Sequence, residues 1–159
     1  MIQRIQSLFL LAAAACFGIA CFMPIGMFTL EGDMLVVYSP WASLHSSNGF
    51  VIETYYIGLL MAILAVMSFV AVFFYKNRPL QSKICMAAIL IGVALLLLMV
   101  YVYPDVVFPK KFGNIEIQYY GNGQLPWVLL PFVSLVCLYL ANRFILRDEK
   151  KVRAADRLR

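Results

Sequence analysis

Apolar residues in this chain are gathered into four long blocks that polar stretches separate. The blocks cover residues 5–28, 55–75, 84–103 and 125–146. Each is long enough to cross the roughly 30 Å hydrocarbon core of a bilayer as a helix of about 20 residues. A helix in a soluble bundle needs a polar face, whereas these blocks are apolar all round. The pattern therefore predicts an all-α membrane protein, built as a bundle of four transmembrane helices.

Two of the connecting loops, residues 29–54 and 104–124, contain segments with the composition of β-strands. The run MLVVYS in the first loop is β-prone and stops at Pro40. The run NIEIQYY in the second loop alternates apolar and polar positions, which is the period of a strand with one covered face. We therefore expect residues 1–159 to form one integral membrane domain with a small extracytoplasmic β-containing cap.

The distribution of cations predicts how the chain is oriented. The composition, with 64% hydrophobic and 13% charged residues, already differs from that of a soluble domain. Eleven of the 13 Lys and Arg residues precede the first block, join the second to the third, or lie in the last turn of the fourth block and after it. Lys and Arg are retained on the cytoplasmic side of a membrane. Both termini are therefore expected in the cytoplasm, and both β-prone loops outside.

The first block also has the basic start and apolar core of a signal peptide, so cleavage has to be considered. Cys16 and Cys21 follow small residues, as a lipoprotein cleavage site requires, but neither has the usual Leu three positions earlier. Apolar character also continues as far as Leu30. We therefore expect an uncleaved first helix, which Pro24 kinks or ends near the outer surface.

Small residues at four-residue spacing predict where helices approach closely. Ala12, Cys16 and Ala20 form such a series in the first block, and Ala88 and Gly92 form another in the third. Side chains this small let a neighbouring backbone come near. We interpret both series as packing faces inside the bundle.

The chain offers little of the chemistry that enzymes need. Its one histidine, His45, has no second metal ligand at a suitable spacing. The cysteines lie inside apolar blocks and form no C-x-x-C pair, which argues against disulfide exchange; they are Cys16, Cys21, Cys85 and Cys137. The blocks carry essentially no acids or bases for an ion relay. We therefore expect no enzyme, catalytic residue, cofactor or metal site, and no nucleic-acid partner.

The last stretch, NRFILRDEKKVRAADRLR, carries seven of the 13 cations. It has good helix formers and neither Gly nor Pro, so the fourth helix is expected to continue into the cytoplasm as a basic tail, residues 147–159. Each cation near an anionic leaflet attracts it by about 1 kcal/mol. Lipid contact is favoured over docking of a protein partner, because charge runs are commonly solvated faces. The candidate contact residues are Arg147, Lys150, Lys151, Arg153, Arg157, Arg159, Lys76, Arg78 and Lys83.

Both ends of the chain resemble a known family. MIQRIQSLFLL at residues 1–11 and RDEKKVRAADRLR at residues 147–159 are similar to the opening and closing of a Bacteroidota family of four-span membrane proteins, domain of unknown function 4293. The similarity extends over the whole length in span number and loop order. It implies a location in the bacterial inner membrane, and it implies no activity, cofactor or site residue.

Two functions are compatible with these features. The first is a non-enzymatic scaffold or accessory subunit of a membrane complex, with the basic tail toward cytoplasmic or lipid partners and the outer loops toward periplasmic ones. The alternative is a small carrier or lipid-binding protein with an apolar cavity between its helices, because such a site needs no charge.

Overall fold

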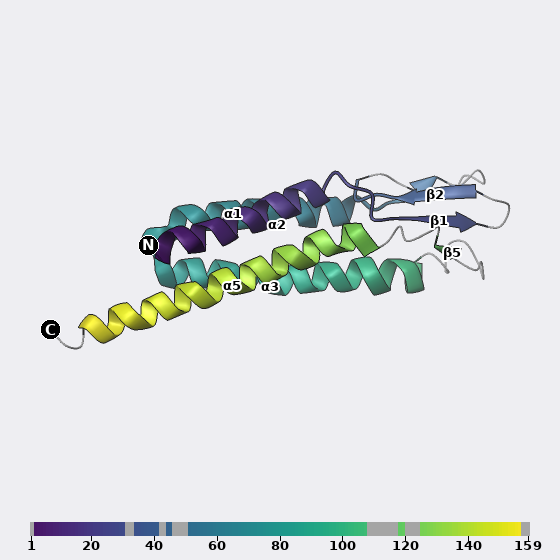
Figure 1. Cartoon of the computed structure of the whole chain (residues 1–159). Helices are drawn as coiled ribbons and strands as arrows, with labels where there is room; N and C mark the ends of the chain where they lie inside the picture. The colour runs from purple at the N-terminus through teal and green to yellow at the C-terminus, as the bar shows by residue number, and fades with distance from the viewer. Residues whose placement is uncertain are drawn as a thin grey trace.

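A computed structural model of the chain describes residues 2–30, 34–41, 44–45, 51–107, 118–119 and 125–156. In this part of the chain four long helices run side by side, and short strands lie beyond one end of them (Figure 1). The helices are α1, Ile2–Ala20; α2, Tyr55–Phe73; α3, Arg78–Leu97; and α5, Leu125–Asp156. A short 3-10 helix, η1, Phe74–Lys76, joins α2 to α3, and a π-helix, η2, Leu98–Val107, extends α3.

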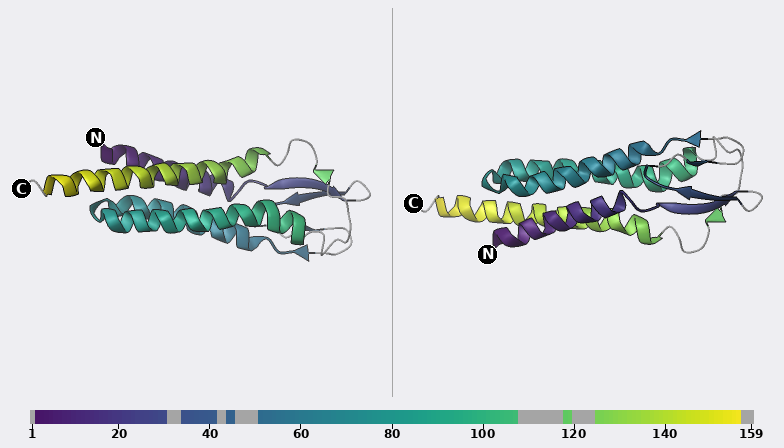
Figure 2. Two further views of the ribbon diagram at one scale, coloured as in Figure 1. Left: turned by 90° about the horizontal axis from the view of Figure 1, so that it is seen from below. Right: turned by 90° about the horizontal axis from the view of Figure 1, so that it is seen from above.

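The four helices form a closed bundle. Both α1 and α3 pack against α2 and α5, so each helix has two neighbours. The chain begins, turns from α2 into α3 and ends at one end of the bundle, which we call the tail end; the other is the strand end (Figure 2). Apolar side chains from all four helices fill the interior, and the largest of these are Leu10, Phe17, Ile57, Met61, Leu64, Leu95, Leu138 and Ile145.

Large apolar side chains also cover the outside of the helices. Leu8, Val66 and Leu90 are each 60 to 69% exposed. A contiguous apolar surface of this kind is unfavourable in water and is matched by lipid tails. Among the described residues, three helical stretches are long and apolar enough to cross a membrane, and a fourth, Ile5–Ala20, is apolar but shorter. The three are Tyr55–Phe73, Arg78–Val102 and Val128–Val152. These are the helices of a membrane protein.

The first helix ends before the end of the first apolar block, so the predicted extent of this element is wrong. The Met23 N–H reaches back to the Ala20 carbonyl at 3.4 Å, which tightens the last turn. Pro24 then has no N–H to donate, and proline disfavours helical backbone at the residue before it. The Ile25 N–H bonds instead to the Tyr38 carbonyl at 2.6 Å. The rest of the block therefore continues as extended chain.

The strands in the described part of the chain form a three-stranded sheet and a separate pair. β1, Gly26–Leu30, lies between β2, Met34–Tyr38, and β5, Gln118–Tyr119, and both pairings are antiparallel. The register places Gly26 opposite Tyr38 and Leu30 opposite Met34. β3, Leu44–His45, pairs with β4, Val51–Ile52.

The two β-prone runs predicted from the sequence have different outcomes. The run MLVVYS contains β2, so that strand is confirmed. The alternating run in the second loop lies outside the described residues except for β5. The structure also leaves undescribed much of the chain around the strands, residues 31–33, 42–43, 46–50, 108–117 and 120–124. An extracytoplasmic β-containing cap therefore stays a prediction.

The close-packed face predicted on α3 is confirmed. Ala88 and Gly92 are buried, and a Cβ added to Gly92 would lie 2.5 Å from Leu135 Cδ2 of α5. On α1 the predicted face is wrong in part, because Ala12 and Cys16 are only partly buried. The buried face of α1 instead follows steps of three and four residues: Leu10, Ala13, Phe17 and Ala20.

A compact contact, which we call the clamp, joins the chain after β2 to the start of α2. The Gly58 N–H donates to the Pro40 carbonyl at 3.2 Å, and Thr54 Oγ1 donates to the Ser39 carbonyl at 2.7 Å. A Cβ on Gly58 would lie 2.7 Å from two ring atoms of Trp41. Glycine at this position therefore lets the indole ring lie directly on the helix.

Candidate functional site

The cations predicted to contact lipid or a partner lie at the tail end of the bundle where the structure describes them. The shape of this end depends on α5. This helix has 32 residues and is therefore about 48 Å long. Its last turns run past the ends of the other helices in every view (Figures 1 and 2). No Gly or Pro follows Pro131 within the helix. The prediction that the fourth helix continues into the basic stretch is confirmed as far as Asp156.

The structure brings some of the predicted contact residues together at this end. Arg147, Lys150 and Lys151 lie exposed on α5, and Lys83 lies exposed on α3. Arg78 lies in the first turn of α3. The side chains of Lys76 and Arg153 lie outside what the structure describes, as do residues Arg157 and Arg159.

Arg78 forms an ion pair that links two helices. Its Nη1 lies 3.2 Å from Asp148 Oδ2 of α5, and the two side chains are only 25% and 14% exposed. A partly buried pair is screened less by salt than a pair on the surface. The sequence suggested lipid contact for Arg78, whereas in the structure its guanidinium group contacts the Asp148 carboxylate.

A hollow of about 160 Å³ lies beside this ion pair. Ile5 of α1 and Phe144 of α5 give it apolar lining, and Arg147, Asp148 and Lys151 give it charged lining. The Phe144 ring stacks on Phe9 of α1, with ring centroids 5.7 Å apart and planes 13° from parallel. The hollow therefore combines an apolar surface from two helices with two exposed cations.

Several polar side chains that the sequence analysis did not single out are buried inside the bundle near the tail end. Ser82 Oγ of α3 donates to Asn142 Oδ1 of α5 at 2.7 Å. Gln81 Nε2 donates to the Ala71 carbonyl of α2 at 3.0 Å. The amide nitrogen of Gln6 is buried without a hydrogen-bond partner in the described part of the chain. For Gln6 and Asn142 the signal in the sequence is a polar residue within an apolar block. Gln81 and Ser82 lie just before the third block, where a polar residue gives no such signal.

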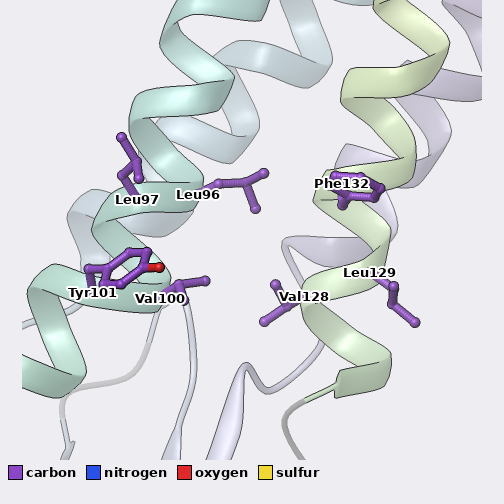
Figure 3. A pocket seen from close by; sticks show the side chains of 7 residues that line it. All are labelled: Leu96, Leu97, Val100, Tyr101, Val128, Leu129 and Phe132. Atoms are coloured by element: carbon purple, nitrogen blue, oxygen red, sulfur yellow. The ribbon is translucent and has the colours of Figure 1, made fainter.

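A second hollow lies at the strand end, between α3 with η2 and α5. It is an open groove of about 460 Å³, and its lining is almost wholly apolar. Figure 3 shows Leu96 and Val100 pointing toward α5 and Val128 pointing toward α3. The remaining lining residues are Leu97, Tyr101, Leu129 and Phe132. The groove is an apolar space between helices of the kind that the alternative function requires.

No group of three or more His, Cys, Asp or Glu side chains that could hold a metal ion occurs among the described residues. The four cysteines are free thiols. Cys21, just after α1, and Cys85 of α3 are buried, and Cys16 of α1 and Cys137 of α5 are partly buried. His45, the histidine of the first loop, lies in β3.

The bundle, its apolar exterior and its charged tail end define a helical membrane protein. The chain belongs to the family described as "Domain of unknown function (DUF4293)", whose model matches residues 2–158. This confirms the family resemblance that the two ends of the sequence carry. Nothing matches in the comparisons with curated proteins and with solved structures.

Proposed function

We propose that the protein is a non-enzymatic scaffold or accessory subunit of a membrane complex, located in the bacterial inner membrane. The observation that carries this proposal is the shape of α5. This single helix packs along the bundle and then projects past it as a charged arm. Exposed Arg147, Lys150 and Lys151 lie where the arm leaves the other helices. An arm anchored by a membrane bundle can present charge to a partner or to lipid headgroups.

The positions of the cations support an orientation with both termini in the cytoplasm. The connection between α2 and α3 and the last turns of α5 lie at the tail end. Cations from distant parts of the sequence are therefore gathered on one side of the apolar region. The rule that Lys and Arg remain inside assigns the tail end to the cytoplasm, and with it the strands to a small extracytoplasmic β-containing cap.

The packing of α1 supports its assignment as a fourth span. Its 19 residues make a helix of about 28 Å, close to the roughly 30 Å of a hydrocarbon core. It packs along both α2 and α5, each of which contains a stretch long enough to cross a membrane. A helix packed between two spans lies at the same depth as they do.

Labelling of single cysteines tests this orientation. In a variant whose four cysteines are replaced by alanine, one cysteine is placed at Asn122 and, separately, one is added after Arg159. We expect an impermeant maleimide to label the first in intact spheroplasts, and the second only after lysis. The reverse pattern would overturn the orientation, and labelling of both positions in intact spheroplasts would overturn the membrane insertion.

Purification from native membranes tests the scaffold function. We expect gentle detergent to recover the protein with another membrane or cytoplasmic protein in a fixed ratio. A variant that combines Lys150→Gln with deletion of residues 154–159 should weaken this association. Lys150 is an exposed cation of the arm that does not line the hollow beside Asp148. Repeated recovery of the intact protein alone would remove the support for an accessory subunit.

The apolar groove in Figure 3 favours a second candidate, a small lipid-binding or carrier protein. Mass spectrometry of the same preparation separates the two functions. A lipid-binding protein should retain a defined lipid that is lost in Val100→Trp, which fills the groove. It should be kept in Val93→Trp, which changes an exposed residue of α3 outside the groove.

A further inference from the structure

We propose that the hollow between α1 and α5 binds one anionic phospholipid, with the lipid phosphate held by Arg147 and Lys151. The inference rests on the membrane insertion given under the proposed function, and it adds a defined site and a ligand class to it. The lining residues come from both ends of the chain: Ile5 from α1, and Phe144, Arg147, Asp148 and Lys151 from α5.

The two cations are arranged to hold one anion between them. Arg147 and Lys151 are four residues apart on α5, so they lie on one face of the helix, one turn apart. Both are exposed, and neither forms an ion pair within the described part of the chain. A guanidinium can bind two phosphate oxygens at once, and an ammonium adds a mobile point charge beside it.

Asp148 lines the same hollow and would repel a phosphate if its charge were uncompensated. Arg78 holds this carboxylate from α3 at 3.2 Å. The ion pair therefore cancels the one acidic charge of the hollow and leaves Arg147 and Lys151 to attract the ligand. Arg78 is thus a positioning residue, which acts on the site through Asp148.

The apolar lining identifies a lipid as the source of the phosphate. Ile5 and Phe144 lie beside the cations, and the stacked Phe9 ring extends the apolar surface along α1. Exposed apolar residues such as Leu8 continue from there into the spanning part of α1. A ligand that carries a phosphate beside hydrocarbon chains can contact both the cations and the apolar surface next to them, whereas a free phosphate contacts only the cations.

The size of the hollow limits what it encloses. Its volume of about 160 Å³ is below the roughly 300–1,000 Å³ of pockets that bury drug-sized ligands. It therefore holds the phosphate and the adjoining part of the glycerol. The acyl chains lie outside it, along the apolar exterior of the bundle.

Lipid binding to the full-length protein in nanodiscs tests the proposal. Retained lipid is measured by native mass spectrometry with phosphatidylglycerol, phosphatidylcholine, or phosphatidylcholine plus inorganic phosphate. We expect the protein to retain one tightly held phosphatidylglycerol. The affinity of the protein for this lipid should fall roughly tenfold or more in Arg147→Gln/Lys151→Gln, because each cation adds to the attraction for the phosphate. As a control, Arg143→Gln removes one positive charge from an exposed position of α5 that does not line the hollow, and it should lower that affinity less than Arg147→Gln does.

The ion pair gives a second, independent readout. Arg78→Gln should weaken phosphatidylglycerol binding because it uncovers the charge of Asp148, and Arg78→Gln/Asp148→Asn should restore it. Restoration distinguishes this role from general destabilisation, which the double variant would share.

Three results would overturn the site. The first is an equal loss of affinity for phosphatidylglycerol in the control and the test variants. The second is equal retention of phosphatidylcholine and phosphatidylglycerol. The third is retention of inorganic phosphate, in place of a phospholipid, by protein in phosphatidylcholine. Each is measured on protein already inserted in a bilayer. Failure of the membrane insertion on which the site rests appears separately, as release of the protein from native membranes by alkaline carbonate.

Discussion

Gly92→Leu is expected to force α3 away from α5 and to lower the free energy of unfolding in mild detergent by about 1–3 kcal/mol. A Cβ at this position would lie 2.5 Å from Leu135 Cδ2, 3.4 Å from Leu135 Cγ and 3.8 Å from Leu64 Cδ1. Leu135 can rotate away from one methyl group, so Gly92→Ala should cost less. A leucine side chain is too large for that adjustment, because side chains from two other helices already occupy the space.

Gly18→Ala is the matched control for this prediction. Gly18 also lies within an apolar helix, but a Cβ there meets nothing within 4 Å. Alanine is a better helix former than glycine, so this change should be neutral or slightly stabilising. Titration with sodium dodecyl sulfate, followed by circular dichroism, measures all three variants. If Gly92→Leu unfolds at the same detergent fraction as Gly18→Ala, the close approach of α3 and α5 does not exist in solution.

The number of helices could be predicted from the sequence because block length alone carries that information. α2 begins and α5 begins where their apolar blocks begin, at Tyr55 and Leu125. The end of α1 could not be predicted in the same way, because apolar strand residues and apolar helix residues have the same hydropathy. Pro24 marked the boundary, but its effect could equally have been a kink.

The inward face of α1 was also beyond the reach of the sequence. A helix that is apolar all round has no polar face to show which side is exposed. Spacing of small residues therefore suggested Ala12 and Cys16, whereas Ala13 and Phe17 are the buried ones. On α3 the same reasoning succeeded, because Gly92 is needed for contact with a large side chain on α5.

The candidate site was predictable in its charge and not in its geometry. Counting cations identified Arg147 and Lys151, and the helical character of the tail followed from its composition. The ion pair between Arg78 and Asp148 joins residues far apart in the chain, and Ile5 reaches the hollow from the opposite terminus. Such contacts depend on which helices are neighbours, and hydropathy does not specify that.

Gly58→Ala is expected to displace Trp41 from α2 and to open the clamp at the strand end. The new methyl carbon would lie 2.7 Å from Trp41 Cδ2 and Cε2 and 3.0 Å from the Pro40 carbonyl oxygen. The backbone cannot move freely, because the Pro40 carbonyl accepts the Gly58 N–H at 3.2 Å and the adjoining Ser39 carbonyl accepts Thr54 Oγ1 at 2.7 Å. The indole is a rigid plane beyond its second torsion angle, so the whole ring has to move to relieve the clash, whereas Leu135 has to move only a methyl group. We expect a loss of about 1–3 kcal/mol in the free energy of unfolding.

Tryptophan fluorescence measures the displacement directly. In a Trp127→Phe background Trp41 is the remaining tryptophan, and Gly58→Ala should shift its emission to longer wavelength and increase its quenching by iodide. A double-mutant cycle with Trp41→Ala, followed by circular dichroism, separates the ring from the backbone. Removing the ring should relieve most of the cost of Gly58→Ala, with a coupling energy of about 0.5–3 kcal/mol. If Gly58→Ala costs the same with and without the ring, the indole does not lie on α2 and the clamp is held by its backbone hydrogen bonds alone.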